Sequence, residues 1–164
     1  MYITFEKLPE EARVWVYQAE RALSDSEQDV VLETGKQFID QWVTHGQPLI
    51  ASIQVRANYF VIIAVDDTQL PSGCSIDASV DFMRNLTNNL SLDFFDRTNI
   101  PLQIEGKVKL VPLVDLKNQI RNGAVSEETL VYNTLVNKKS ELNNWLLSLR
   151  ESWLARYFPQ TQEK

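Results

Sequence analysis

The sequence is poor in the residue types on which many catalytic and metal sites depend: it has one cysteine, one histidine and five glycines among 164 residues. A single cysteine cannot form a disulfide within the chain or build a cysteine-based zinc site. No apolar run approaches ~18 residues, so we expect no transmembrane helix. The N-terminus lacks the basic start and apolar stretch of a signal peptide. These absences favour a cytoplasmic protein with no metal and no cofactor.

The few glycines also exclude the common nucleotide-binding loops. A Walker-type loop needs two glycines five positions apart, followed by Lys and Ser or Thr. Only Gly35-Lys36 resembles the end of that motif, but Val30 stands at the first glycine position and Gln37 follows the lysine. A dinucleotide-binding fingerprint is missing as well.

Basic residues are in the minority, 16 against 22 acidic ones, and the net charge is −6. Because nucleic acids and anionic membranes attract positive charge, we expect this chain to bind neither. The longest basic run is Lys138-Lys139. A small, local site for an anionic ligand remains compatible with this charge.

What the chain does have is apolar periodicity, with 44% hydrophobic residues. We expect a single α+β domain over residues 1–158 and a frayed polar tail over 159–164. A strand is predicted at 13–23, followed by a helix that Ser24 begins with a capping box to Glu27 and that His45-Gly46 ends. Gly35 lies on the apolar stripe of this helix, which predicts a close approach to the sheet.

A hairpin is predicted from strands at 49–56 and 59–65, turning at Ala57-Asn58. Its second arm is apolar on both faces and is therefore expected to be a central strand. A second helix follows over 75–90, with Ser72 or Ser75 as its N-cap.

The second half predicts a hairpin, 100–104 with 107–111, that turns at Glu105-Gly106. A short helix over 113–122 stopped by Gly123, a strand at 129–132 and a long amphipathic helix over 138–157 are predicted to follow. The resulting order matches an antiparallel sheet of ferredoxin-like βαββαβ order, with an extra C-terminal strand and extra helices.

Cys74 lies at the junction between the first predicted hairpin and the second predicted helix. The start of a helix lowers the pKa of a thiol, which would make Cys74 a candidate nucleophile or redox sensor with His45 as the candidate base. The competing interpretation is a small thiol buried under the helix, which is the commoner fate of a free cysteine.

The same junction is a candidate anion site, with Ser72, Gly73 and Ser75 around a helix N-terminus. The competing interpretation is an ordinary helix cap. Arg56 shares one strand face with Ser52 and Gln54, while Arg97 follows an aromatic pair, and both are candidate ligand contacts. If Trp15 and Tyr17 lie on the opposite face of the sheet, Arg56 is expected to be a solvated end of the hairpin.

Four stretches are familiar in combination: Gln41–Leu49, Val55–Phe60, Gly73–Val80 and Leu92–Arg97. Together they resemble a family of small uncharacterised bacterial proteins, some of which are labelled "ABC transporter ATPase". The resemblance covers most of the chain. It implies a bacterial source, but no established activity and no catalytic residues.

Three functions follow as hypotheses. The first is a non-catalytic protein that binds a partner or small ligand, as a homodimer in which Trp145 and Trp153 either cover the sheet or pack across a two-fold axis. The second is an enzyme or redox sensor that uses Cys74. The third, ATP hydrolysis, is disfavoured because the Walker motif is missing.

Overall fold

The computed structural model describes residues 1–66, 68 and 71–159, and the fold is mixed α+β with antiparallel sheets. The chain forms two compact units. The first comprises residues 1–96 and 135–143, and the second comprises residues 97–134 and the chain after residue 143. Of the tail predicted at 159–164, residues 160–164 lie outside the described residues.

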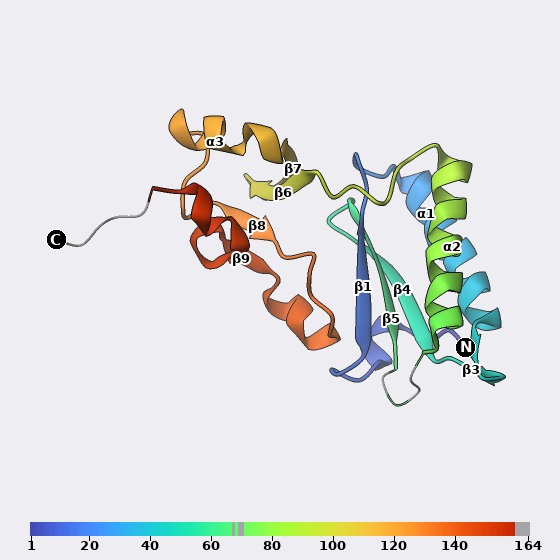
Figure 1. Ribbon diagram of the computed structural model, residues 1–164. Helices are drawn as coiled ribbons and strands as arrows, with labels where there is room; N and C mark the ends of the chain where they lie inside the picture. The colour runs from blue at the N-terminus through green and yellow to red at the C-terminus, as the bar shows by residue number, and fades with distance from the viewer. Residues whose placement is uncertain (67, 69–70, 160–164) are drawn as a thin grey trace. The chain divides into compact units, whose positions relative to one another are not determined.

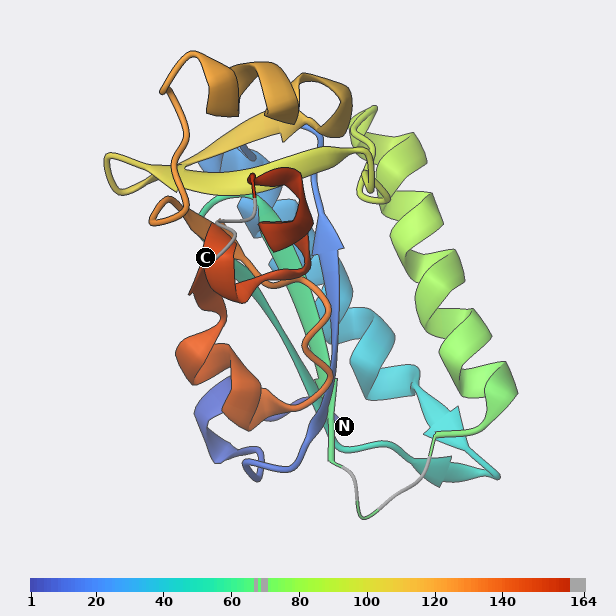
Figure 2. The same cartoon turned by 60° about the vertical axis from the view of Figure 1, so that its left-hand side comes forward.

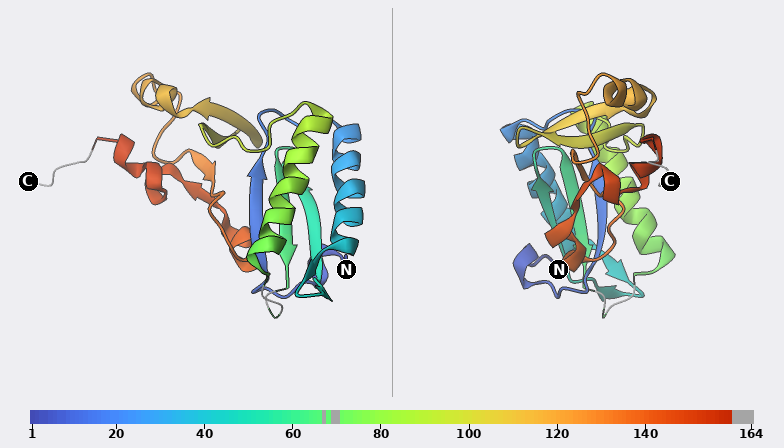
Figure 3. Two further views of the ribbon diagram at one scale, coloured as in Figure 1. Left: turned by 45° about the vertical axis from the view of Figure 1, so that its right-hand side comes forward. Right: turned by 90° about the vertical axis from the view of Figure 1, so that its left-hand side faces the viewer.

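The first unit is built on a three-stranded antiparallel sheet of order β1-β5-β4, formed by β1 (Arg13–Gln18), β5 (Phe60–Val65) and β4 (Ala51–Arg56). Every residue of β5 is buried, so the predicted central strand is confirmed. Helices α1 (Asp25–Gln41) and α2 (Gly73–Leu90) lie side by side over one face of this sheet (Figure 1 and Figure 3, left).

Other segments of the first unit bond to both edges of this sheet. The N-terminal residues pair with β4, where Ile3 N–H donates to the Ala51 carbonyl at 3.0 Å. On the β1 edge, Val14 N–H donates to the Asn137 carbonyl at 3.1 Å, and Asp96 N–H donates to the Gln18 carbonyl at 3.4 Å. The short 3₁₀ helix η1 (Phe5–Lys7) also contacts β4.

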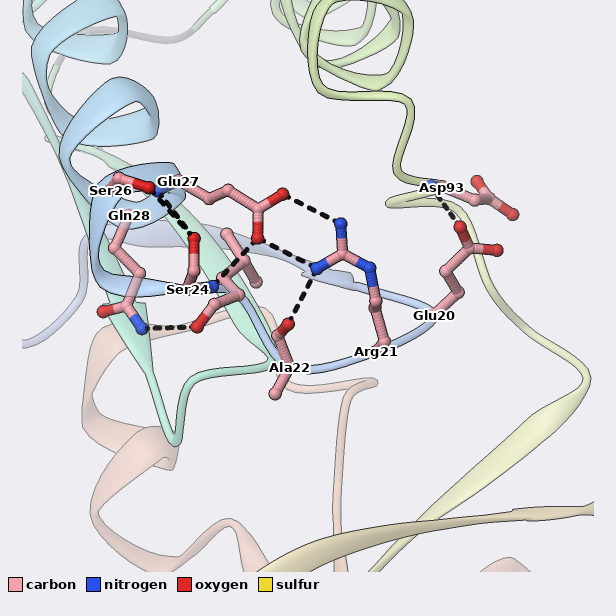
Figure 4. Close-up of polar contacts among 9 residues, drawn as sticks. Glu20, Arg21, Ala22, Ser24, Ser26, Glu27, Gln28 and Asp93 are labelled. Carbon is pink, nitrogen blue, oxygen red and sulfur yellow. Dashed lines mark hydrogen bonds and ion pairs between the residues drawn. The ribbon is translucent and has the colours of Figure 1, made fainter.

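The start of α1 is the predicted capping box. Ser24 Oγ accepts from Glu27 N–H at 3.2 Å, and the Glu27 carboxylate accepts from Ser24 N–H at 2.9 Å (Figure 4). The same carboxylate pairs with both terminal nitrogens of Arg21 at 2.9 Å. The predicted close approach is confirmed too, because a Cβ at Gly35 would lie 2.6 Å from Ile53 Cδ1.

The predicted end of this helix is wrong. α1 ends at Gln41, and His45-Gly46 instead turn a small hairpin between β2 (Val43–Thr44) and β3 (Gln47–Pro48). His45 and Gly46 have φ values of 48° and 77°. A two-residue hairpin turn of type I′ requires positive φ at both central residues. The backbone at His45-Gly46 therefore fits a hairpin turn and not the end of a helix.

The second unit contains a four-stranded sheet of order β7-β6-β8-β9. The predicted hairpin is confirmed as β6 (Asn99–Ile104) and β7 (Lys107–Pro112), with β7 on the edge, and the predicted short helix is α3 (Leu113–Arg121). β8 (Leu130–Tyr132) confirms the predicted short strand, and β9 (Leu146–Ser148) pairs with it. This unit has an apolar core of its own, which includes Leu102, Leu116 and Leu149.

The predicted ferredoxin-like order describes the first unit's strands only in part. The βαββαβ order has four strands, and three of them lie side by side as β1-β5-β4. The fourth, β6, pairs with β7 and β8 in the other sheet. The β1 edge that a fourth strand would occupy is bonded instead to the residues near Asn137 and Asp96.

The predicted helix over 138–157 is wrong. This segment forms the 3₁₀ helices η2 (Lys139–Asn144), η3 (Leu149–Glu151) and η4 (Trp153–Tyr157), with β9 between η2 and η3. Its backbone bonds elsewhere, because Leu149 N–H donates to the Thr129 carbonyl at 2.9 Å. Ser152 Oγ donates to the Leu149 carbonyl at 2.8 Å and accepts from Leu154 N–H at 3.1 Å, which favours separate turns over one continuous helix.

Candidate functional site

The hydroxyl groups at the start of α2 form a cap that is docked onto the β2–β3 hairpin. Ser72 Oγ accepts from Ser75 N–H at 3.1 Å, so Ser72 is the N-cap. Ser72 N–H donates to Thr44 Oγ1 at 3.2 Å, and Ser75 Oγ donates to the Val43 carbonyl at 2.7 Å. The start of α2 therefore lies beside the β2–β3 hairpin (Figure 2). Ser75 is buried, whereas Gly73 is exposed. The cap interpretation therefore accounts for both serines.

Cys74 is exposed, so the expectation of a buried thiol is wrong. The residues of α2 that point into the core are Ser75, Ser79, Met83 and Leu86. Cys74 precedes Ser75, and successive residues point about 100° apart around a helix, so its side chain lies on the flank. The thiol is accessible to solvent and to reagents.

The structure brings the two catalytic candidates into one region of the first unit. His45 follows Thr44 directly, and Thr44 accepts the hydrogen bond from Ser72 that joins the hairpin to the start of α2. His45 is exposed, like Cys74, and neither side chain donates to the other. They are neighbouring groups rather than an assembled nucleophile and base.

Arg56 lies on the face of the sheet opposite to Trp15. Trp15, Ile63 and Ile53 are in register and share the helix-covered face, whereas Arg56 is in register with Phe60 on the other face. The prediction that an arginine in this position is solvated is wrong. Its guanidinium is half-buried over the Phe5 ring, 5.6 Å from the ring centroid. Burial lowers the pKa of Arg56, while the Glu6 carboxylate opposes that shift.

The predicted ligand-binding residues do not form one site. Arg56 ends β4, whereas α2 begins after β5, whose last residue pairs with the first residue of β4. Arg56 and the serine cap therefore lie at opposite ends of the first sheet, about 17 Å apart along a six-residue strand. Arg97 is exposed and belongs to the second unit.

A groove between α1 and α2 is a site that the sequence did not predict. It has a volume of about 280 Å³ and is open to solvent. Phe38 of α1 stacks on Phe82 of α2, with ring centroids 4.8 Å apart and planes 11° from parallel, and with Leu86 they form an apolar floor. The other lining residues are uncharged and polar: Thr34, Gln37, Gln41, Asn85 and Asn89.

The two helices contribute to the groove in the same pattern. The α1 residues are 34, 37, 38 and 41, and the α2 residues are 82, 85, 86 and 89, so each set follows the i, i+3, i+4, i+7 spacing of one helix face. The helices run antiparallel, because Trp42 at the end of α1 donates from Nε1 to the Ser75 carbonyl at the start of α2, 2.9 Å away. On each helix, the groove residues form a second stripe beside the stripe of buried residues. That second stripe is the sequence pattern that could have indicated the groove.

Charged side chains stand outside the groove and are mostly acidic. Asp29 and Glu33 are exposed and four residues apart on α1, and Asp77 and Asp81 repeat that spacing on α2. Two exposed basic residues lie on the same helices: Lys36 on α1, and Arg84 on α2, whose guanidinium lies 3.5 Å from the Asp81 carboxylate. We call the four carboxylates, Asp29, Glu33, Asp77 and Asp81, the acidic ridges.

Among residues 1–66, 68 and 71–159, no group of three His, Cys, Asp or Glu residues could hold a metal ion. None of the helices described there has the length and apolar character needed to cross a membrane.

Comparisons of the chain with protein-family models, with curated proteins and with solved structures found no match.

Proposed function

We propose that this chain is a non-catalytic binding protein and that the α1–α2 groove holds its partner or small ligand. The observation that carries the proposal is the composition of the groove: a stacked aromatic floor, a rim of amides and no charged lining residue. Apolar surface with a few polar groups around it is the usual make-up of a binding site.

The amide rim suits an uncharged partner surface. Each amide of Gln37, Gln41, Asn85 and Asn89 carries both donors and an acceptor. These side chains are exposed, so their hydrogen-bonding groups are open to a ligand without breaking the core. A volume of about 280 Å³ lies near the lower limit for small-molecule sites.

The test is a ¹H–¹⁵N correlation spectrum of the whole protein recorded with a library of uncharged fragments. We expect shifts in the side-chain NH₂ signals of Asn85 and Gln37, and loss of the Gln37 shift in N85W, where the new ring fills the groove from its exposed rim. N122W, at an exposed position of the second unit, is the matched control. If fragments bind without shifting the side-chain signals of the groove residues, the proposal is refuted.

A second candidate function is a thiol enzyme or redox sensor at Cys74. Its supporting observation is that the thiol is exposed in the first turn of an 18-residue helix. This candidate predicts that Cys74 reacts with iodoacetamide below pH 7 faster than free cysteine does. A rate equal to that of free cysteine would eliminate this candidate.

The proposed homodimer has support in the second unit, where Val114 and Trp153 are 85% and 49% exposed. Large apolar side chains of this kind are often contact residues between subunits. Analytical ultracentrifugation of the chain alone tests it, with W153A as the variant expected to weaken association. We also propose that the protein is cytoplasmic, because a single unpaired cysteine favours a reducing compartment.

A further inference from the structure

The occupant of the groove can be specified further from charge. We infer that the α1–α2 groove binds an amphipathic helix of another protein, whose apolar face enters the groove and whose flanks carry lysine or arginine. This inference rests on the proposed binding function and names the chemistry of the partner.

The floor of the groove selects apolar side chains. Leu86 is 2% exposed, whereas Phe38 and Phe82 keep part of their rings accessible. The open shape along two helices suits a row of side chains better than an enclosed cofactor. A helix supplies such a row at positions i, i+3, i+4 and i+7 while satisfying its own backbone hydrogen bonds.

Strand addition, the main alternative for a peptide, would meet sheet edges that other segments of the first unit already bond. Residues 1–3 bond to β4 at Ala51, and residues near Asn137 and Asp96 bond to the two ends of β1. The helical layer is therefore the face on which a partner segment can dock without displacing part of the unit.

The acidic ridges select the charge of the partner. Asp29 and Glu33 precede the groove residues of α1, and Asp77 and Asp81 precede those of α2, so the antiparallel helices place one acidic pair toward each end of the groove. The first unit as a whole carries 16 acidic and 8 basic residues, a net charge of −8. A second copy would bring the same acidic ridges against these, and like charges repel.

The experiment uses three synthetic helical peptides and the full-length protein. The first has leucines at i, i+3, i+4 and i+7 with lysines on both flanks; the second keeps the leucines but has glutamates on the flanks; the third keeps the lysines but has serines in place of the leucines. Fluorescence anisotropy gives each Kd, and the ¹H–¹⁵N spectrum locates each binding site.

We expect the leucine–lysine peptide to bind at least about tenfold more tightly than either of the others at low salt, and its advantage over the glutamate peptide to shrink as salt rises. The double variant E33Q/D81N should weaken the lysine peptide severalfold and spare the glutamate peptide. D115N, which removes an exposed carboxylate of the second unit, is the matched control and should change neither.

The outcomes separate this inference from the proposed function. Equal affinity for the lysine and glutamate peptides, or groove shifts with uncharged fragments alone, would overturn the helical partner and leave the groove as a binding site. Dissociation of a dimer of the chain by N85W would overturn it in favour of a second copy. Absence of groove shifts with every fragment and peptide would overturn both.

Discussion

Gly35 shows how one missing side chain sets the distance between a helix and a sheet. The nearest atoms to a Cβ at this position would be Ile53 Cδ1 at 2.6 Å and Ile53 Cγ2 at 3.0 Å. Ile53 is 3% exposed and has little room to move. The close packing of α1 on β4 therefore depends on glycine, although glycine lowers the intrinsic stability of a helix.

We expect G35A to destabilise the protein by about 1 kcal/mol, because overpacking costs about 1–3 kcal/mol and the gain in helix propensity returns up to about 1 kcal/mol. I53V removes the atom nearest to the new methyl group. In the I53V background the same G35A change should therefore cost less, although Cγ2 at 3.0 Å remains close. Urea denaturation of the four proteins measures the coupling, and additive effects would contradict the steric explanation.

The Glu27 carboxylate predicts how the stability of the first unit depends on acid. Hydrogen bonds from Arg21 and then from the Ser24 backbone lower the pKa of Glu27 from 4.5 to about 2 (Figure 4). A lowered pKa in the folded state means that the stabilisation is present above about pH 4.5 and is lost as the pH falls toward 2.

We expect E27Q to reduce this acid sensitivity, because glutamine keeps an acceptor for Ser24 N–H but cannot titrate. The ion pair is at the surface, so its loss at pH 7 should cost only about 0.5 kcal/mol. Urea midpoints from pH 2 to pH 7 measure both effects. E33Q, on the exposed side of the same helix, provides the comparison, and an identical pH profile for E27Q and the parent protein would argue against this role for Glu27.

At the scale of the elements, the sequence correctly predicted the helices, strands and turns whose local residue preferences agree with the tertiary contacts that they make. The capping box at Ser24 was identified correctly because Ser and Glu at this spacing favour one local geometry. The turns at Ala57-Asn58 and Glu105-Gly106 were identified correctly because Asn58 and Gly106 readily adopt positive φ, although Ala57 and Glu105 adopt it too, at 53°, against the preference of their residue types. The segment 138–157 was not, because its apolar residues at spacings of three and four fit a helix and a series of 3₁₀ turns equally well. Pairing of Leu146–Ser148 with β8 decides the outcome, and that is a tertiary contact.

The candidate site was predicted less well for a related reason. Ser72, Gly73 and Ser75 were correctly placed together at a helix start, but no local pattern could show that Thr44 and Val43 would accept their hydrogen bonds. The groove exists only because α1 and α2, which are far apart in the sequence, pack side by side. The groove-lining residues of one helix therefore could not indicate it alone.

Ser72 should be the most sensitive position of the α2 cap. S72A removes the acceptor for Ser75 N–H, and we expect a loss of about 1 kcal/mol, the typical value for an N-cap serine. S72D should restore most of the stability because aspartate accepts the same hydrogen bond. Thermal denaturation of the three proteins tests this, and equal instability of S72A and S72D would show that the hydroxyl acts elsewhere.

At the scale of the whole molecule, each unit has its own apolar core, with Met83 in the first and Leu116 in the second. Both side chains are fully buried, so truncation to alanine should cost about 2–5 kcal/mol in either case. If the units open separately, native-state hydrogen exchange should accelerate only in the second unit for L116A and chiefly in the first for M83A. Uniform acceleration by both variants would instead show one cooperative domain over 1–158, as the sequence analysis expects.

The hydrogen bond from Val14 to Asn137 has a consequence for biosynthesis. Strand β1 emerges early from the ribosome, but the segment that covers its edge is translated only after α3 and β8. Until then the part of the β1 edge at Val14 lacks its partner in the nascent chain, and an open strand edge is a template for aggregation. Synthesis terminated before residue 135 should therefore yield insoluble chains.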